Sequence, residues 1–371
     1  MPPAQRRENL EDAIVSIVVD NYNYARFLRR SIDSALAQTH PRVQVVVVDD
    51  GSTDASVDII KSYGDQVNFV GKPNGGQASA VNAGIAVSNG DIVIVLDSDD
   101  ELYPEAAERV AARMTPAAAK AHWRLEVVDG EGNSLGYTEP VAEVALAHGD
   151  VVPQLLHRGS CATPVMSGNA FPRWVLDRLL PIPEGQYYTS ADEYLRGMSG
   201  LFGPVVAIDE VLGLYRIHGT NASKPTVLNV KRLARYVEVD QLRNASIART
   251  AIAMGHLRLP SDSPLPDFAL NDQFGLRARV TSLRLDPDHH PVPGDRLAGL
   301  AWHGAQNALF QAPLDVRRRV LFCLWFVIVA FAPYPVAHRA AEWLHVKGSR
   351  PTWMQWLMPR RRPSFRSRDR S

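Results

Sequence analysis

Residues 45–54 have the sequence VVVVDDGSTD, and residues 92–100 have the sequence IVIVLDSDD. In both stretches a short aliphatic run, rich in β-branched residues, is followed at once by acids. Such a run predicts a strand that is buried on both faces, as in a parallel sheet. The Gly-Ser-Thr-Asp that ends the first stretch predicts a turn and a helix N-terminus. Each stretch is therefore predicted to be a strand whose carboxyl end bears acidic side chains.

The sequence around these stretches repeats the strand–helix order. Further strands are predicted at 13–19 and 67–70, and helices over 27–36, from 54 to about 63, over 77–87 and from about 104. Repeated strand–helix units predict an α/β fold with a mostly parallel, doubly wound sheet. Farther along, 227–254 and 295–311 are predicted to be helical, whereas 259–293, rich in Pro and Asp, is predicted to be a loop.

Acidic side chains are predicted to gather at one edge of this sheet. Asp20, Asp49, Asp50, Asp97 and Asp99 follow predicted strands, and the carboxyl ends of parallel strands are where such folds bind ligands. Carboxylates that lie close together repel one another unless a cation lies among them. The pattern therefore predicts a divalent metal held by oxygen ligands and shared with a phosphate-bearing substrate. No GxGxxG or P-loop motif follows a strand, which argues against a dehydrogenase or a P-loop ATPase.

Four motifs together carry a family resemblance. They are VVVVDDGSTD at 45–54, NGGQASAVNAGIAVSNGDIVIVLDSDD at 74–100, SADEYL at 190–195 and YRIHG at 215–219. In this order and spacing they resemble family 2 glycosyltransferases, and the resemblance covers about 200 residues. A single DxD motif is common by chance, whereas the ordered set is specific. The resemblance implies a GT-A type fold and inverting transfer from a nucleotide sugar.

The resemblance also implies roles for the acids at the strand ends. Asp50 is expected to accept a hydrogen bond from the nucleotide base. Asp97 and Asp99 form the DxD motif, one for the ribose and the other for the metal on the diphosphate. Asp99 is favoured as the metal ligand, and Asp100 is a second candidate. The alternative for any one of these residues is an acid in a solvated loop after a strand.

The general base is expected to be Asp192, which matches the acid of the family's Glu-Asp motif. The sequence departs from that motif, because Ala191 replaces the glutamate and Glu193 follows, so the register is open by one residue. The base removes the proton from the acceptor hydroxyl, while the metal stabilises charge on the leaving phosphate. The alternative for Asp192 is an acid that only favours the dipole of its helix.

Four further residues have both a functional and a structural interpretation. His218 is expected to complete the metal shell or to be a structural histidine. Lys72 is expected to meet the nucleotide or to be a solvated surface lysine. Asn169 is expected to bond a sugar hydroxyl or to cap the helix that follows. Asp20 stands where many relatives have Pro or Thr, so it adds an acid near the expected base pocket.

The charge of the chain is divided unequally along its length. Lys plus Arg and Asp plus Glu number 40 each in 371 residues, so the formal net charge is zero. From Arg317 onward there are 12 basic and two acidic residues, which leaves −10 on residues 1–316. A hydrophobic content of 46% excludes a wholly disordered chain. Two cysteines argue against a disulfide framework, and a polar N-terminus without a signal-peptide core predicts a cytoplasmic location.

The basic C-terminal part contains an apolar run at 320–337. Its uninterrupted portion before Pro333 has 13 residues, fewer than the ~20 that a spanning helix needs. Basic flanks and four tryptophans favour attachment at a membrane surface, with a packed soluble helix or a true span as alternatives. No aromatic–basic recognition module is visible, so no nucleic-acid partner is expected. The predicted divisions are a catalytic domain at 13–225, a helical extension at 226–312 and a membrane-associating segment at 313–371.

The expected function is transfer of a sugar from a nucleotide sugar, a UDP-sugar being favoured, to a glycan or lipid-linked acceptor. The enzyme is expected to need Mn²⁺ or Mg²⁺ and to act in cell-envelope polysaccharide synthesis at the inner face of the cell membrane. One alternative is a non-catalytic nucleotide-sugar-binding scaffold of the same fold. Another is a nucleotidyltransferase, which needs a Gly/Arg/Lys loop for the triphosphate that the sequence does not show.

Overall fold

The computed structural model describes residues 10–218, 228–311, 315–346, 349 and 351. The described chain divides into two compact units. The first contains 10–153 and 161–218, and the second contains 154–160 and the described residues from 228 onward. The domain boundary predicted at 225 falls within 219–227, outside the described residues. The described parts of the predicted 226–312 and 313–371 segments belong to one unit.

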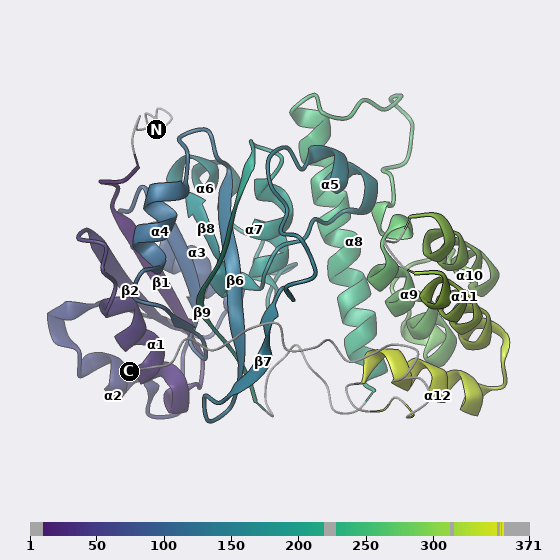
Figure 1. Ribbon diagram of the computed structural model, residues 1–371, viewed down its shortest axis with the longest axis horizontal. Coiled ribbons are helices and arrows are strands. Elements are labelled where there is room, and N and C mark those ends of the chain that lie inside the picture. The colour runs from purple at the N-terminus through teal and green to yellow at the C-terminus, as the bar shows by residue number, and fades with distance from the viewer. Residues whose placement is uncertain (1–9, 219–227, 312–314, 347–348, 350, 352–371) are drawn as a thin grey trace. The chain divides into compact units, whose positions relative to one another are not determined.

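The first half of the sheet in the first unit is parallel, as predicted. Its strands run in the order β3-β2-β1-β4 (Figure 1). Their bounds are β1 (Val15–Asn21), β2 (Val43–Asp49), β3 (Asn68–Gly71) and β4 (Ile92–Asp97). The helices of this half are α1 (Ala25–Leu36), α2 (Ser56–Lys61), α3 (Gln77–Val87) and α4 (Ala106–Arg113).

Helices cover both faces of this half, because alternate residues of a strand point to opposite faces. Ile17 of β1 belongs to the buried cluster that contains Leu28 of α1. Val18 faces the other way, toward α3, where a Cβ on Gly84 would lie only 2.3 Å from the Val18 side chain. The glycine lets α3 lie close to the sheet. The doubly wound arrangement is therefore confirmed for this half.

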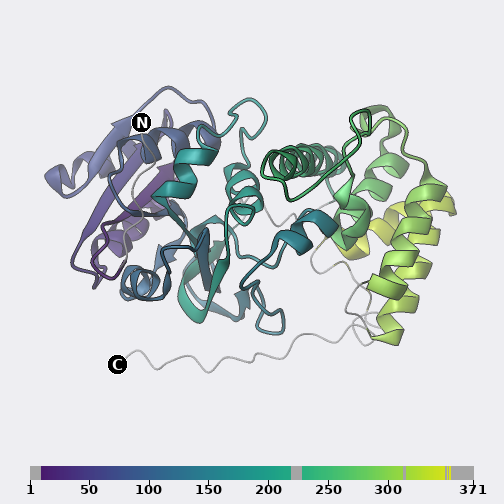
Figure 2. The same cartoon turned by 90° about the horizontal axis from the view of Figure 1, so that it is seen from above.

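The second half of the sheet is mixed rather than parallel. The order continues from β4 through β8 (Asn169–Pro172), β6 (Lys120–Asp129) and β9 (Val205–Ile217) to β5 (Glu101–Leu102), and β7 (Ser134–Glu139) pairs with β6. β6 and β9 are parallel, whereas β8 runs antiparallel to both of its neighbours. The helices of this half are α6 (Arg173–Leu179) and α7 (Ala191–Ser199) (Figure 2), whereas α5 (Val152–Arg158) belongs mostly to the second unit.

The second unit is helical. Its main helices are α8 (Val230–Ala253), α9 (Gln273–Leu285), α10 (Leu297–Gln306), α11 (Val316–Phe331) and α12 (Tyr334–His345). The loop predicted at 259–293 is wrong over α9, where Leu276 and Val280 lie one turn apart and enter a core with Trp325 and Phe326. Trp325 donates a hydrogen bond to the Ala340 carbonyl at 2.7 Å. Among the described residues, no helix combines the length and apolar character needed to cross a membrane.

Candidate functional site

The carboxyl ends of β1 and β4 bring two of the predicted acids side by side. Asp20 is the register neighbour of Asp97. Burial, followed by the nearby Asp99 carboxylate, raises the pKa of Asp20 to about 7. One carboxyl oxygen of Asp20 is buried and has no hydrogen-bond partner among the described residues. Burial raises the pKa of Asp97 well above its usual range, and the charges of Asp20, Asp100, Asp99 and Asp192 add to this effect.

Asp99 and Asp100, the other two acids that follow β4, have partners of their own. Asp99 lies 2.9 Å from Nε2 of His218, whose ring packs on Phe27 with 4.7 Å between ring centroids. Asp100 is fully buried and accepts hydrogen bonds from the Ser167 hydroxyl at 2.6 Å and the Arg216 backbone amide at 2.9 Å. Both carboxylate oxygens of Asp100 thus accept hydrogen bonds from within the protein, whereas Asp99 and His218 form a pair of potential metal ligands.

The donor set suits a divalent cation that is shared with a phosphate. Among the described residues, no group of three or more His, Cys, Asp or Glu side chains is arranged as a complete metal site. Asp99 and His218 supply two ligands at most, and phosphate oxygens and water commonly supply the others at Mg²⁺ sites. Burial raises the pKa values of both Asp20 and Asp97, and neighbouring carboxylates raise them further, so negative charge is crowded here. A bound cation would relieve this repulsion.

Asp50 lies beneath the glycine turn that follows β3. Its carboxylate is buried and accepts hydrogen bonds from the backbone amides of Gly75 at 2.9 Å and Gly76 at 2.7 Å. Lys72 donates to the same carboxylate at 2.6 Å and to the Pro73 carbonyl at 2.8 Å. The two predicted nucleotide-binding residues, Asp50 and Lys72, are therefore brought together as an ion pair that also organises the turn.

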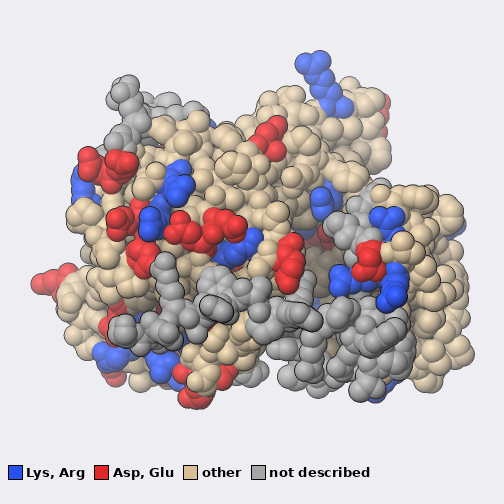
Figure 3. All heavy atoms as spheres, in the orientation of Figure 1, with Lys and Arg blue, Asp and Glu red and all other residues tan. Residues whose placement is uncertain are grey.

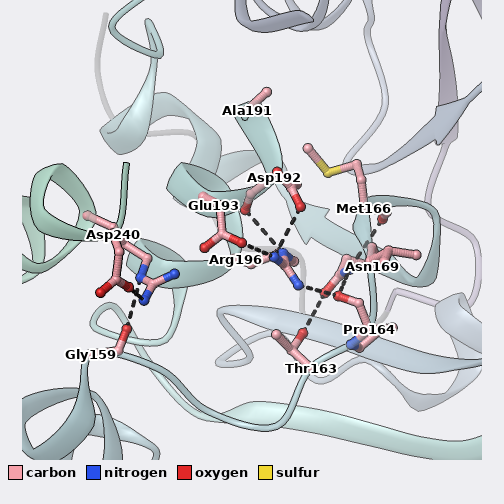
Figure 4. Close-up of polar contacts among 12 residues, drawn as sticks. Gly159, Thr163, Pro164, Met166, Asn169, Ala191, Asp192, Glu193, Arg196 and Asp240 are labelled. Atoms are coloured by element: carbon pink, nitrogen blue, oxygen red, sulfur yellow. Dashed lines mark hydrogen bonds and ion pairs between the residues drawn. The ribbon is translucent and has the colours of Figure 1, made fainter. Parts of the chain in front are cut away.

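Asp192 lies in the first turn of α7, after Ser190 as the N-cap residue. Arg196, one turn later, forms ion pairs with Asp192 at 3.0 Å and Glu193 at 2.7 Å (Figure 4). The Arg196 guanidinium also donates to the Pro164 carbonyl at 2.8 Å. Both acids stay partly exposed, and Asp192 contributes to the negative charge around Asp97. Arg196 was missed by sequence reasoning, although its i,i+4 spacing from Asp192 is the signal of a helical ion pair.

Asn169 is fully buried, and its side chain is used within its own loop. Its carbonyl oxygen accepts from the Thr163 hydroxyl at 3.0 Å, and its amide donates to the Val165 carbonyl at 2.7 Å and the Met166 carbonyl at 3.2 Å (Figure 4). These contacts brace the loop before β8. The side chain makes no N-cap hydrogen bond to α6, whose N-cap is Pro172, so the predicted capping role is wrong.

Comparison with known proteins identifies the region that contains these strand-end acids. Residues 16–133 match the family model described as glycosyl transferase family 2. An uncharacterized glycosyltransferase of Nostoc sp. is 34% identical over 213 residues, which is 56% of this chain and 66% of that protein. The chondroitin synthase of Pasteurella multocida is 45% identical over 98 residues, 26% of this chain and 10% of that enzyme.

Other relatives extend the comparison. A Rickettsia typhi protein, also an uncharacterized glycosyltransferase, is 35% identical over 36% of this chain, but the match spans only 43% of its own length. Among solved structures, S. aureus TarS in complex with UDP-GlcNAc has 14% identity and a TM-score of 0.48 over 92% of each chain. The region 16–133 therefore belongs to family 2 of the glycosyltransferases, and the described chain combines this region's mixed α/β sheet with a helical second unit.

Proposed function

We propose that this protein is a metal-dependent inverting glycosyltransferase that moves a sugar from a nucleotide sugar, a UDP-sugar being favoured, to a glycan or lipid-linked acceptor. The observation that carries the proposal is the arrangement at the sheet edge, where Asp20 and Asp97 are register neighbours, Asp99 contacts His218 at 2.9 Å, and the charge of Asp192 adds to the raised pKa of Asp97. This arrangement supports a site in which one acid removes a proton while its neighbours bind a metal and a diphosphate.

In this proposal each residue has one task at the donor. Asp50, held by Lys72 and the glycine turn, accepts a hydrogen bond from the nucleotide base, and the Lys72 ammonium lies beside it. The Asp20 oxygen that has no hydrogen-bond partner among the described residues accepts from a donor hydroxyl. Asp97 is assigned to the ribose. Asp99 and His218 would hold Mn²⁺ or Mg²⁺, which supplies electrostatic stabilisation of the leaving diphosphate.

Asp192 is the proposed general base. Its carboxylate takes the proton of the acceptor hydroxyl as that oxygen bonds to the anomeric carbon. The bond between the anomeric carbon and the phosphate oxygen breaks on the opposite side, so the configuration inverts. Arg196 orients Asp192 through their ion pair. Arg196 also donates a hydrogen bond to the Pro164 carbonyl, which links α7 to the loop that precedes β8 and contains the hydrogen-bond partners of Asn169. Asn169 thus supports the donor-sugar side of the site from within the loop.

The test is a panel of nucleotide sugars assayed for donor hydrolysis and transfer with Mn²⁺, Mg²⁺ or EDTA. Asp192→Asn should lower turnover by about 10²- to 10⁴-fold with donor binding retained. Glu193→Gln is the matched control, because Glu193 forms an ion pair with the same residue, Arg196. Loss of turnover in the control alone would move the base to Glu193. Donor binding without hydrolysis or transfer would support the scaffold alternative, and unchanged activity in EDTA would refute the metal.

We further propose that the second unit attaches the enzyme to the inner face of the cell membrane. One face of α11 is buried in the helical core, whereas the other exposes a stripe of apolar side chains at helical spacing. The stripe consists of Val316, Val320, Leu324, Val327 and Phe331, each at least 50% exposed. Scattered exposed apolar residues are normal, but a contiguous stripe marks an interaction surface.

Charge supports an anionic lipid surface as the occupant of this stripe. Arg317, Arg318 and Arg319 lie in the first turn of α11 beside the stripe. An amphipathic helix with basic residues lies in the membrane interface, where each basic residue contributes ~1 kcal/mol on an anionic leaflet. On the face shown in Figure 3, the described basic and acidic side chains are interspersed, so the stripe rather than a broad basic surface supports the proposal. A membrane location fits a lipid-linked acceptor and synthesis of cell-envelope polysaccharide.

Vesicle sedimentation tests the attachment. Leu324→Glu should reduce binding to vesicles containing anionic lipid, whereas Ile252→Glu, the same charge change at an exposed site on α8, should not. A point substitution is used rather than a deletion of residues 314–371, because the deletion would remove Trp325 and Phe326 of α11 from the core of the second unit. Equal binding by both variants would refute the membrane role. Concentration-dependent dimerisation that Leu324→Glu abolishes, without vesicle binding, would instead assign the stripe to a second copy of the chain.

A further inference from the structure

Gln77, the first residue of α3, bridges two parts of the candidate site that are far apart in sequence. Its side-chain amide donates to an Asp97 carboxylate oxygen at 3.1 Å. Its side-chain carbonyl accepts from the backbone amide of Ala191 at 3.3 Å. Ala191 is the first residue of α7 and immediately precedes Asp192. One side chain therefore contacts both Asp97 at the sheet edge and the start of the helix that carries the proposed base.

Two neighbouring contacts dock the same segments against each other. The Tyr188 hydroxyl lies 2.5 Å from the Asn74 side-chain oxygen, and the Ala78 backbone amide donates to the Tyr188 carbonyl at 3.4 Å. A Cβ on Gly76 would lie 2.5 Å from that carbonyl, so the two backbones approach more closely than any other residue at 76 would permit. The segment before α7 that contains Tyr188 thus packs against residues 74–78, where the glycine turn leads into α3.

We infer that Gln77 is a positioning residue that fixes the start of α7, and with it Asp192, relative to Asp97. The role rests on the proposed glycosyltransferase function. It requires one group that donates to a carboxylate and accepts from an amide at the same time, which a primary amide can do. The first N–H groups of a helix lack partners within the helix, so the Ala191 amide gains a partner that also sets the helix position.

Position matters here because the proton and the sugar move in one step. The base must lie within hydrogen-bond reach of the acceptor hydroxyl while the donor is held at the acidic edge. A displacement of about 1 Å in such an arrangement can cost 10²-fold in rate. Losing the bridge should therefore affect turnover more than donor affinity, because the donor's own contacts remain.

The test compares Gln77→Met with a matched variant on the same helix. Met keeps the length of the side chain and removes both hydrogen bonds. Asn82 makes an equivalent amide bridge from α3, donating to the Ile182 carbonyl at 3.0 Å and accepting from its backbone amide at 2.8 Å. Asn82→Leu therefore removes a similar bridge that touches none of the strand-end acids. Gln77→Met should lower kcat by roughly 10- to 100-fold with little change in the KM for donor, and Asn82→Leu should change neither.

Hydrogen exchange gives a readout that does not depend on activity. In the protein without ligand, Gln77→Met should speed amide exchange at residues 190–193, whereas Asn82→Leu should leave it unchanged. Unchanged exchange and unchanged kcat in Gln77→Met would overturn the positioning role. Equal losses of kcat in both variants, in step with their melting temperatures, would also overturn it and indicate a structural effect. Faster exchange in Gln77→Met, together with a wild-type protein inactive on every donor, would retain the bridge and refute the proposed function alone.

Discussion

Replacing Gly76 with alanine should destabilise the first unit and disturb the approach to α7. Gly76 has φ 82° and ψ 172°, a region that is essentially confined to glycine. A Cβ there would lie 2.5 Å from the Tyr188 carbonyl oxygen and 2.7 Å from the Tyr188 ring. The backbone strain costs about 1–3 kcal/mol, and relief of the overlap costs about 1–3 kcal/mol more. The expected loss is therefore roughly 2–6 kcal/mol of unfolding free energy.

A matched glycine separates the two contributions. Gly64 has φ 55°, and a Cβ added there would meet no atom within 4 Å, so Gly64→Ala should cost only the backbone term of about 1–2 kcal/mol. Urea unfolding followed by circular dichroism compares the two variants with the wild type. Adding Tyr188→Ala to Gly76→Ala should recover part of the loss, because it removes the ring but leaves the carbonyl. Donor turnover should fall in Gly76→Ala and stay near the wild-type value in Gly64→Ala.

The refuting result is specific. If Gly76→Ala is no less stable than Gly64→Ala, the segment around Tyr188 does not rest on the glycine turn. The docking of the α7 start on α3 would then be wrong, and with it the structural basis of the role given to Gln77. If stability falls as expected but turnover does not, the docking stands and its link to catalysis fails.

Three further predictions concern other buried groups. Burial lowers the pKa of Lys120 to about 8, so between pH 8 and its ordinary value of 10.5 the unfolded chain holds a proton that the folded chain has released. The free energy of unfolding should therefore rise across that window by up to about 3 kcal/mol relative to Lys120→Met. The same difference in unfolding free energy between wild type and Lys120→Met at pH 8 and pH 10, measured with urea, would contradict this. His218→Phe should raise the Mn²⁺ concentration needed for half-maximal turnover because Asp99 loses its partner, and an unchanged metal titration would exclude His218 as a ligand. Trp325→Phe should cost about 1–3 kcal/mol, since it removes the bond to Ala340 and buried volume, with thermal unfolding as the measurement.

Local sequence was sufficient for the parallel half of the sheet and for the acids at its edge. The runs at 45–48 and 92–96 form β2 and β4, and the acids after them lie at strand ends as predicted. The reason is that burial on both faces of a strand leaves a continuous aliphatic run, which is visible without any knowledge of distant residues. The ordered motifs that contain these runs also indicated the family and its expected fold.

Local sequence was not sufficient where the pairing or packing is long-range. The antiparallel insertion of β8 between β4 and β6 depends on residues more than 40 positions apart, and its four-residue strand has no distinctive period. Helix α9 falls within a predicted loop, because Pro and Asp at both ends of 259–293 obscure the helical spacing of Leu276 and Val280. In both cases the tertiary core supplied the information that the local pattern lacked.

The candidate site divides in the same way. The sequence by itself determined which residue types stand at the strand ends, because parallel strands bring their carboxyl ends to one edge. Only the tertiary structure decided how these side chains are held. Asp50 is held by the glycine turn, and Asn169 is bonded within its own loop. Asp97 is joined through Gln77 to α7, whose first residue, Ala191, lies 114 positions after Gln77. A hydrogen bond between residues so far apart depends on how the chain packs, and no local spacing encodes it.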